Sequence, residues 1–325
     1  MPTLLPISAI VPTRDRPQPL LRMLHSLAAQ SAQPVELVVV DASTDDQTQQ
    51  LCQSSIAGLA TQICYSRAIA VGAAVQRNQA VAAATQPYIL FCDDDIWFEP
   101  ECLSRLWEGL RCDSALGGIN AMITNQRYLP PGRISRLLFR VLHGQTETSY
   151  AGRCIGPGLN LLPEDCPDLP DVVPTDWLNS TCTLYRREVL PHPPFLAHFT
   201  GYSLLEDVTL SLTVGKRWHL ANARTARIYH DSQPGEHKNN VAVLAKMELV
   251  NRHYVMTQVL QRQRWQDYGK LALLQLFGIA ASLVSLTGWR SLPAMLWGKL
   301  QGIAAITSSI YSPVIPDGTQ HIPNE

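Results

Sequence analysis

The sequence predicts an α/β fold: a Rossmann-like, mostly parallel sheet with flanking helices, followed by a helical C-terminal region. Short apolar runs alternate with helix-like segments over residues 7–92, which is the pattern of strand–helix–strand units. The runs are almost continuously apolar, as in strands that are covered on both faces. From residue 241 onward, long apolar helical segments replace this alternation, so we expect a different architecture there.

The predicted elements of the first part follow one another in regular order. Strands are expected at Ile7–Val11, Val35–Val40, Gln62–Ser66 and Tyr88–Cys92, and helices at Leu20–Gln30, Asp45–Leu59 and Ala73–Ala84. Ligands of open parallel sheets bind beyond the carboxyl ends of the strands. Asp41 and Asp93 each follow directly after a strand. We therefore expect these two side chains to converge on one pocket.

Composition excludes several classes of protein. The net charge is -1 and no long run of Lys and Arg occurs, which argues against binding of nucleic acid. The 8 cysteines form no Cys-x-x-Cys pair, so neither a zinc site nor a disulfide framework is indicated. Residues 1–7 lack the basic and apolar parts of a signal peptide. These features favour a cytoplasmic protein.

Three consecutive carboxylates, Asp93, Asp94 and Asp95, follow the strand at Tyr88–Cys92. Side chains alternate along an extended backbone, so Asp93 and Asp95 are expected to point to one side and Asp94 to the other. Oxygen ligands of this kind bind Mg²⁺ or Mn²⁺, which usually carry substrate phosphates as well. The alternative is a solvated acidic turn that caps a helix over Ile96–Leu110.

The segment after the first strand, Pro12-Thr-Arg-Asp-Arg-Pro17, contains no glycine-rich phosphate loop and no Walker-type lysine. This absence argues against a dinucleotide-dependent dehydrogenase and a P-loop ATPase. Any bound phosphate must then be neutralised by a metal ion and by arginine side chains.

Several motifs in a fixed order point to one family. Ile10-Val-Pro-Thr-Arg14, Val38-Val-Val-Asp-Ala-Ser-Thr-Asp-Asp46, Arg77-Asn78 and Phe91-Cys-Asp-Asp-Asp95 together resemble the inverting glycosyltransferases of family 2, which have a GT-A fold. Leu205-Glu-Asp-Val-Thr-Leu-Ser-Leu212 resembles the family's Glu-Asp segment, and Tyr229-His-Asp231 its late histidine. One departure is Asp41-Ala-Ser43, where members often have Asp-Asp-Gly-Ser.

The resemblance implies roles for the acidic triplet. Asp95 matches the metal-binding position, and Asp93 lies near the ribose or takes part in metal binding. For Asp94, contact with the donor and a hydrogen bond to nearby backbone remain alternatives. His230 is implied as a third metal ligand, which would favour Mn²⁺ slightly over Mg²⁺, and His237 is the competing candidate.

The same resemblance places three further residues at the donor. Thr13 and Asp41 are implied to hold the nucleoside, and Arg77 to add positive charge or a hydrogen bond near the nucleotide. The alternative for Thr13 is a simple turn residue. The alternative for Arg77 is an ion pair on a solvated helix face, which contributes little energy.

Glu206 and Asp207 stand at the start of a segment with apolar residues at helical spacing. A helix N-terminus favours the ionised form of such carboxyl groups. An inverting transfer needs a general base for the acceptor hydroxyl. By resemblance Asp207 is this base and Glu206 its supporting neighbour, whereas ordinary helix capping is the structural alternative.

The remaining chain divides into an acceptor side and a helical region. Residues 1–240 are expected to form the catalytic domain, with nucleotide-sugar binding in about 1–124 and the acceptor side in about 125–240. Between Asn125 and Asp176 the chain loses helical or strand periodicity and gathers Pro and Gly, which is typical of a functional lid or of a partly disordered loop. Trp177 either stacks on a sugar ring or packs in the core.

The region 241–312 is expected to be helical, with a flexible tail at 313–325. One helix is predicted over Val241–Tyr268, and the apolar runs Leu271–Leu286 and Leu292–Ile310 follow, the second broken by Pro293. The first run is slightly short of a spanning helix, but its aromatic and basic flanks suit a membrane interface. The alternatives are a helical pair buried against the catalytic domain or in a homodimer.

These inferences describe a metal-dependent inverting glycosyltransferase that moves a hexosyl or deoxyhexosyl group. Its partners would be a nucleotide-diphosphate sugar donor and a glycan or lipid-linked acceptor, in synthesis of a cell-surface glycan at the cytosolic face of the membrane. The alternative is a non-catalytic nucleotide- or sugar-binding protein on the same fold. Asp93, Asp95 and Asp207 argue for the enzyme.

Overall fold

The computed structural model describes residues 1–199, 203–233 and 240–308. The strands of its central sheet are β1 (Thr3–Thr13), β2 (Ala32–Asp41), β3 (Gln62–Arg67), β4 (Tyr88–Cys92), β5 (Ile96–Phe98), β6 (Leu116–Ile123), β9 (Val172–Thr175), β10 (Cys182–Arg186) and β11 (His219–His230). Two short strands, β7 (Cys154–Ile155) and β8 (Leu159–Asn160), pair separately.

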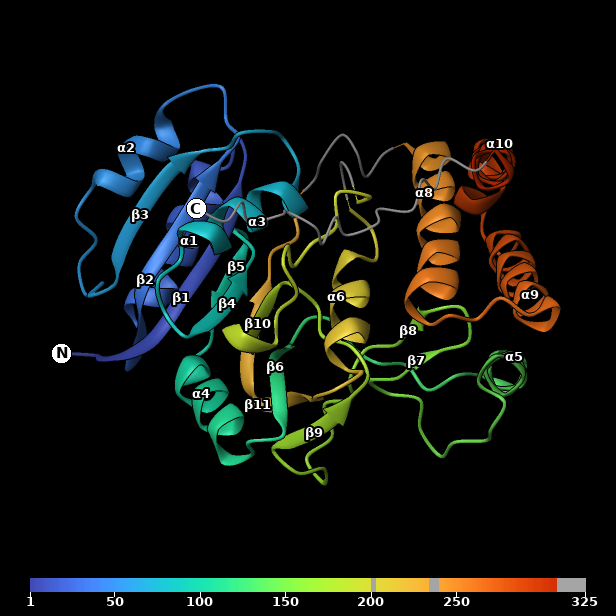
Figure 1. Ribbon diagram of the computed structural model, residues 1–325, viewed down its shortest axis with the longest axis horizontal. Coiled ribbons are helices and arrows are strands. Elements are labelled where there is room, and N and C mark those ends of the chain that lie inside the picture. Colours follow the sequence, from blue (N-terminus) through green and yellow to red (C-terminus); the bar gives the residue numbers. More distant parts are fainter. Residues whose placement is uncertain (200–202, 234–239, 309–325) are drawn as a thin grey trace, which may run out of the picture.

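The helices lie on both faces of this sheet and at one end of the molecule (Figure 1). They are α1 (Pro17–Ala28), α2 (Gln47–Gln53), α3 (Ala73–Ala83), α4 (Cys102–Cys112), α5 (Arg133–His143), α6 (Glu206–Val214), α8 (Val241–Tyr254), α9 (Trp265–Ser282) and α10 (Leu286–Thr307). A 3₁₀ turn at Arg187–Val189 and a π turn at Val255–Val259 complete the described elements.

The sheet has the strand order β3-β2-β1-β4-β10-β6-β11-β5, and β9 pairs with β11. Strands β1, β2, β3, β4, β6 and β11 run in one direction, whereas β5, β9 and β10 run against them. Six of the nine strands are therefore mutually parallel, which confirms the predicted α/β class with a mostly parallel sheet.

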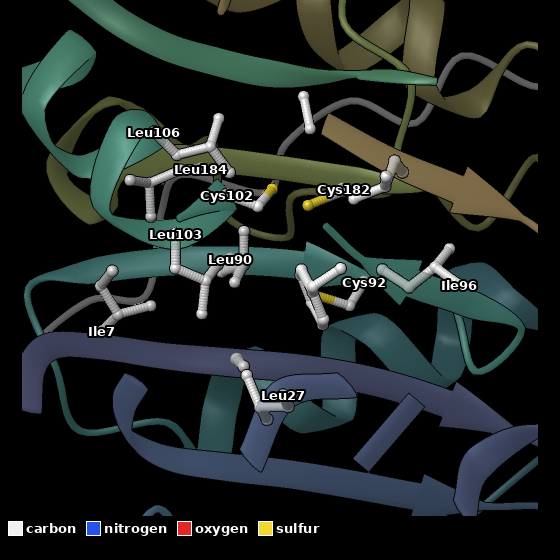
Figure 2. Packing of buried hydrophobic residues seen from close by; sticks show 14 of the residues in the cluster. Ile7, Leu27, Leu90, Cys92, Ile96, Cys102, Leu103, Leu106, Cys182 and Leu184 are labelled. Carbon is white, nitrogen blue, oxygen red and sulfur yellow. The ribbon is translucent and has the colours of Figure 1, made fainter. Parts of the chain in front are cut away.

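Alternation along the strands builds two apolar layers, one on each face of the sheet. β1 places Ala9 and Val11 in one layer and Ile10 in the other. Helices α1 and α4 cover the first layer, and α3 and α6 cover the second. Figure 2 shows the first layer, in which Cys92 of β4 lies close to Ile96 and Cys182. This buried packing anchors β4, the strand that directly precedes the acidic triplet.

The carboxyl ends of the parallel strands meet at one edge, as the sequence predicts. Thr13, the last residue of β1, pairs with Asp41, the last residue of β2. β4 lies on the other side of β1 and ends at Cys92. Thr13, Asp41 and the start of the acidic triplet thus share this edge.

Two predicted helices of the first part differ from those observed. α2 covers only Gln47–Gln53 of the expected Asp45–Leu59. The expected helix over Ile96–Leu110 is wrong at its start, because Ile96–Phe98 forms β5 and pairs with β11, and the helix begins at Cys102. Sheet pairing of a distant strand overrides the local preference there.

The stretch between Asn125 and Asp176 is more regular than predicted. It contains α5 and the short strands β7, β8 and β9. Pro130, Gly132 and Gly144 flank α5, and these residues give the whole segment the composition of a loop. Its apolar residues recur at helical spacing, which was the available signal.

The C-terminal region is helical, but its helices are divided differently from the prediction. The predicted helix Val241–Tyr268 is wrong: α8 ends at Tyr254, Gln261 adopts a left-handed φ of 56°, and α9 begins at Trp265. Pro293 lies inside α10 and does not end it. α10 packs against α8, although a proline inside a helix removes one backbone hydrogen bond.

Within the described residues, no helix is both long enough and apolar enough to cross a membrane. The predicted flexible tail at 313–325 and the candidate ligand His237 lie outside the described residues.

Candidate active site

The backbone turns at Asp94 and Asp95, so the extended conformation that the alternation prediction assumed is not present, although the predicted grouping of Asp93 with Asp95 is observed. Asp93 and Asp95 lie with His230 in one cluster. Asp94 lies beside this cluster, and its Oδ2 accepts a hydrogen bond of 2.7 Å from Thr13 Oγ1. Asp94 and Asp95 are each only 4% exposed. The interpretation of this triplet as a solvated acidic turn is therefore wrong.

Asp93, Asp95 and His230 form a candidate metal site. Each offers one ligand atom, and these atoms lie within 4.8 Å of one another. His230 reaches the aspartates because β11 pairs with β5, which sets His230 opposite Ile96. Its Nε2 lies 3.1 Å from Asp95 Oδ1. Two carboxylates and an imidazole are a donor set that Mn²⁺ accepts, so these residues fit the expected cation.

The surroundings of the triplet separate the pKa values of its members. Burial opposes ionisation of Asp95, but hydrogen bonds from His230 and the Gln233 backbone hold its pKa below the ordinary value. Burial raises the pKa of Asp94 to about 7, and the neighbouring Asp95 charge adds to the rise against the opposing effects of Thr13 and Arg16. Asp95 is thus the carboxylate that stays ionised, as a metal ligand must.

Arg77 links the triplet to the Glu-Asp segment. It lies on α3, is 5% exposed, and its Nη2 is 2.8 Å from Asp93 Oδ1. Its Nη1 also forms an ion pair with Glu206 Oε1. Burial lowers the pKa of Arg77, but the charges of Glu206 and Asp93 outweigh this effect and raise it. The alternative of an ion pair on a solvated helix face is wrong for this residue.

Glu206 and Asp207 open α6, as the sequence predicts. Burial raises the pKa of Glu206 to about 7, although the charge of Arg77 lowers it. Burial also raises the pKa of Asp207 to about 6, against the hydrogen bond that its Oδ1 accepts from Val208 N at 2.8 Å. Asp207 remains half-buried. A partly accessible carboxyl group with a pKa near neutrality can accept a proton from a bound hydroxyl group.

Asp41 lies further along the same edge in a separate polar cluster. Its carboxylate accepts hydrogen bonds from Ser43, from Tyr65 Oη at 3.0 Å and from Arg67 Nη1 at 3.1 Å. The Asp41 side chain is fully buried. Arg67 also pairs with Asp46. Asp41 therefore organises the loop after β2 through these contacts.

Two arginines at this edge were not assigned from the sequence. Arg16 Nη1 lies 3.3 Å from Asp94 Oδ1 and 3.4 Å from Asp95 Oδ2, and Arg67 holds Asp41. The signal for Arg16 was its place directly after the first strand, in a segment from which cationic phosphate contacts were expected. Arg67 gave no such signal, because only the pairing of β2 with β3 brings it opposite Asp41.

Trp177, considered as a platform for a sugar ring, packs in the core instead. It is 6% exposed and its Nε1 donates a hydrogen bond of 2.8 Å to Leu161 O. It lies in a cluster with Phe199 and Val208. The structure thus favours the packing interpretation.

Replacement of Arg77 by methionine is expected to lower the free energy of unfolding by about 3–5 kcal/mol. The change leaves the buried Glu206 carboxylate and Asp93 without their shared partner. Urea unfolding measures the loss. Arg153→Met is the matched control, because the ion pairs of Arg153 are more exposed. This substitution should lower the free energy of unfolding by less than about 1 kcal/mol. Equal losses in both variants would contradict the bridging role.

The fold of this chain is of the GT-A class. Residues 8–148 match the family model described as Glycosyl transferase family 2, which confirms the resemblance predicted from the motifs. The matched segment runs from within β1 to just beyond α5. Comparison with curated protein sequences gives no match.

Solved structures share the architecture at low sequence identity. A mannosyltransferase from Pyrobaculum calidifontis, in complex with GDP-Man and Mn²⁺, is 14% identical with a TM-score of 0.51, covering 94% of this chain and 87% of that chain. GalNAc-T7 with UDP, GalNAc and Mn²⁺ is 12% identical with a TM-score of 0.52, covering 82% of this chain and 54% of that chain. These likenesses establish the GT-A fold.

Proposed function

We propose that this protein is a metal-dependent, inverting glycosyltransferase that moves a hexosyl or deoxyhexosyl group from a nucleotide-diphosphate donor to an acceptor hydroxyl. The observation that carries the proposal is the bridge made by Arg77. This buried side chain joins Asp93, in the candidate metal site, to Glu206 beside Asp207. This bridge supports one site that contains both the candidate metal ligands and the candidate base.

On the donor side, Asp93, Asp95 and His230 would hold Mn²⁺ or Mg²⁺, and a bound ion supplies Lewis-acid stabilisation of the departing diphosphate. Arg16 lies directly beside this cluster. Its guanidinium group would help to neutralise the diphosphate of the donor beside the metal ion. Thr13 fixes Asp94 by a hydrogen bond, so this contact orients the middle carboxyl group.

The nucleoside is proposed to lie further along the edge. Thr13 and Asp41 terminate neighbouring strands there, and Arg67 holds the Asp41 carboxylate in place. We propose the donor side within about residues 1–124 and the acceptor side within about 125–240, with the helical region beyond.

On the acceptor side, Asp207 is proposed as the general base. The acceptor oxygen attacks the anomeric carbon while the bond from that carbon to the diphosphate oxygen breaks, and the hydroxyl proton moves to the Asp207 carboxylate. Glu206 stays fixed by Arg77. Attack from the face opposite the leaving group inverts the configuration. The nucleoside diphosphate leaves as the second product.

A glycan or lipid-linked acceptor in cell-surface glycan synthesis would place the protein in the cytoplasm, at the cytosolic face of the membrane. The second candidate, a binding protein without catalysis, is distinguished by turnover. The buried and partnered state of Asp95 together with the raised pKa of Asp207 favours the enzyme.

The proposal is tested by thermal unfolding of the protein with Mn²⁺ and a panel of UDP-, GDP- and dTDP-sugars. A donor present at about 100 times its Kd stabilises the folded state by about 2.7 kcal/mol. We expect one nucleotide class to raise Tm by roughly 5–10 °C, and a chelator to remove the shift. If no nucleotide sugar raises Tm at any metal concentration, the donor assignment is wrong.

A further inference from the structure

Exposed apolar side chains gather on three helices that lie outside the candidate site. In Figure 1, α5, α9 and α10 occupy the end of the molecule opposite β2 and β3. α9 joins the other two: its Lys270 Nζ donates a hydrogen bond of 3.0 Å to Leu142 O of α5, and its Gln275 bonds Lys299 of α10. The three helices are therefore neighbours, with α9 in contact with both α5 and α10.

α5 divides into three stripes along its axis. Leu138 and Leu142 are buried, whereas Ile134, Leu137 and Val141 are 77%, 63% and 45% exposed. Spacings of three and four residues put the exposed residues on one face. This apolar face is turned away from the core, so the contacts within the chain do not explain it.

An arginine stripe runs beside this face. Arg133, Arg136 and Arg140 recur at three- and four-residue spacing and are all exposed. Within the described part of the chain, none of the three forms an ion pair, and α5 contains no acidic residue. A helix with an apolar face bordered by cations is typical of segments that lie in the plane of a membrane interface.

α10 presents a second apolar face. Its inner side packs on α8, where Gly298 leaves no room for a Cβ beside the Ala242 carbonyl oxygen and where Lys299 Nζ is 2.5 Å from Glu248 Oε2. Its outer side exposes Trp289 and Trp297. Tryptophan is enriched at the level of lipid headgroups.

α9 supplies the apolar surface between the two other helices. Leu273 and Leu276 are exposed on it, whereas Leu274 and Phe277 pack towards α5. Surfaces of this kind on soluble proteins mark sites of interaction. We call the outer faces of α5, α9 and α10 the apolar platform.

We propose that the apolar platform binds the surface of a bilayer that contains anionic lipids. The apolar residues would enter the headgroup boundary, and the arginine stripe of α5 would contact the negatively charged headgroups. Symmetric pairing of two chains through this surface would bring the two unpaired arginine stripes together, which disfavours a dimer. None of the platform residues belongs to the candidate site, so this inference does not depend on the proposed reaction.

Vesicle co-sedimentation of the full chain tests the proposal. We expect binding to vesicles of phosphatidylcholine with phosphatidylglycerol and much weaker binding to phosphatidylcholine alone. Arg133→Gln, Arg136→Gln and Arg140→Gln together should weaken binding to the anionic vesicles roughly 100-fold. Ile134→Ser with Leu137→Ser should weaken binding to both types of vesicle.

The matched control removes three cations elsewhere, by Arg111→Gln, Lys216→Gln and Arg217→Gln on α4 and after α6. It should bind the anionic vesicles within about threefold of the parent chain, since electrostatic attraction fades within a Debye length. Circular dichroism confirms that each variant is folded. Absence of vesicle binding, or an equal loss in the control, overturns the proposal. So does a concentration-dependent dimer that Leu137→Ser abolishes.

Discussion

Replacement of Asp207 by asparagine is expected to lower kcat by about 10²–10⁴-fold while the Kd for donor and metal ion stays within a few-fold of the parent value. Asparagine keeps the shape of the side chain but cannot accept the proton of the acceptor hydroxyl at neutral pH. Asp207 is not among the clustered candidate metal ligands. Initial rates at saturating donor, together with calorimetric titration of the donor, measure the two quantities.

The pH profile gives an independent readout of the same residue. Burial raises the pKa of Asp207 to about 6, and a general base acts in its deprotonated form. The rate should therefore fall as the pH decreases through 6, by about tenfold for each further pH unit. The residual activity of Asp207→Asn should lack this acidic limb.

Asp168→Asn is the matched control, because Asp168 is an exposed carboxylate in the same half of the chain. It should leave kcat and the pH profile unchanged. If Asp207→Asn turns over at the parent rate, another residue is the base, although donor binding through the triplet would be unaffected by that result.

Replacement of Asp95 by alanine is expected to abolish metal-dependent binding of nucleoside diphosphates. Asp95 is a buried carboxylate that is held by His230 and by the Gln233 backbone. Loss of an outer-shell partner costs roughly 10–100-fold in metal affinity, so loss of a ligand should exceed about 100-fold. Titration of UDP and GDP with and without Mn²⁺ measures the change.

Asp168→Ala serves as the control for this substitution, and Asp95→Asn separates charge from shape. The asparagine variant can still accept the hydrogen bond from Gln233 N, so it should fold like the parent chain and bind the metal weakly. Thermal unfolding without ligand shows whether each variant is folded. Unchanged Mn²⁺-dependent affinity in folded Asp95→Ala would remove this residue from the metal site.

The sequence predicted the features that depend on local pattern. The apolar runs correctly indicated β1, β2, β3 and β4, and β4 was predicted with its observed bounds. Asp93 and Asp95 were correctly grouped, although a turn at Asp94 and Asp95, and not an extended strand, arranges them. The acidic start of α6 was also recognised. These features follow from side-chain periodicity and from polarity changes within short windows.

The C-terminal helices were predicted less well. Apolar content indicated a helical region, but the break after Tyr254 and the continuation of α10 through Pro293 were missed. α5 was hidden between Pro- and Gly-rich segments. In each case the outcome depends on packing against other helices, which a short sequence window does not contain.

The connections within the site required the folded chain. Pairing of β11 with β5 brings His230 to Asp95, which lies far from it in the sequence, and the packing of α3 lets Arg77 reach both Asp93 and Glu206. The strength of an ion pair between buried groups depends on the distance between them and on their desolvation, and both are set only when the chain folds. Residue types and their order along the chain thus identified the family and its candidate acids, whereas long-range packing chose the partners and the pKa values of those acids.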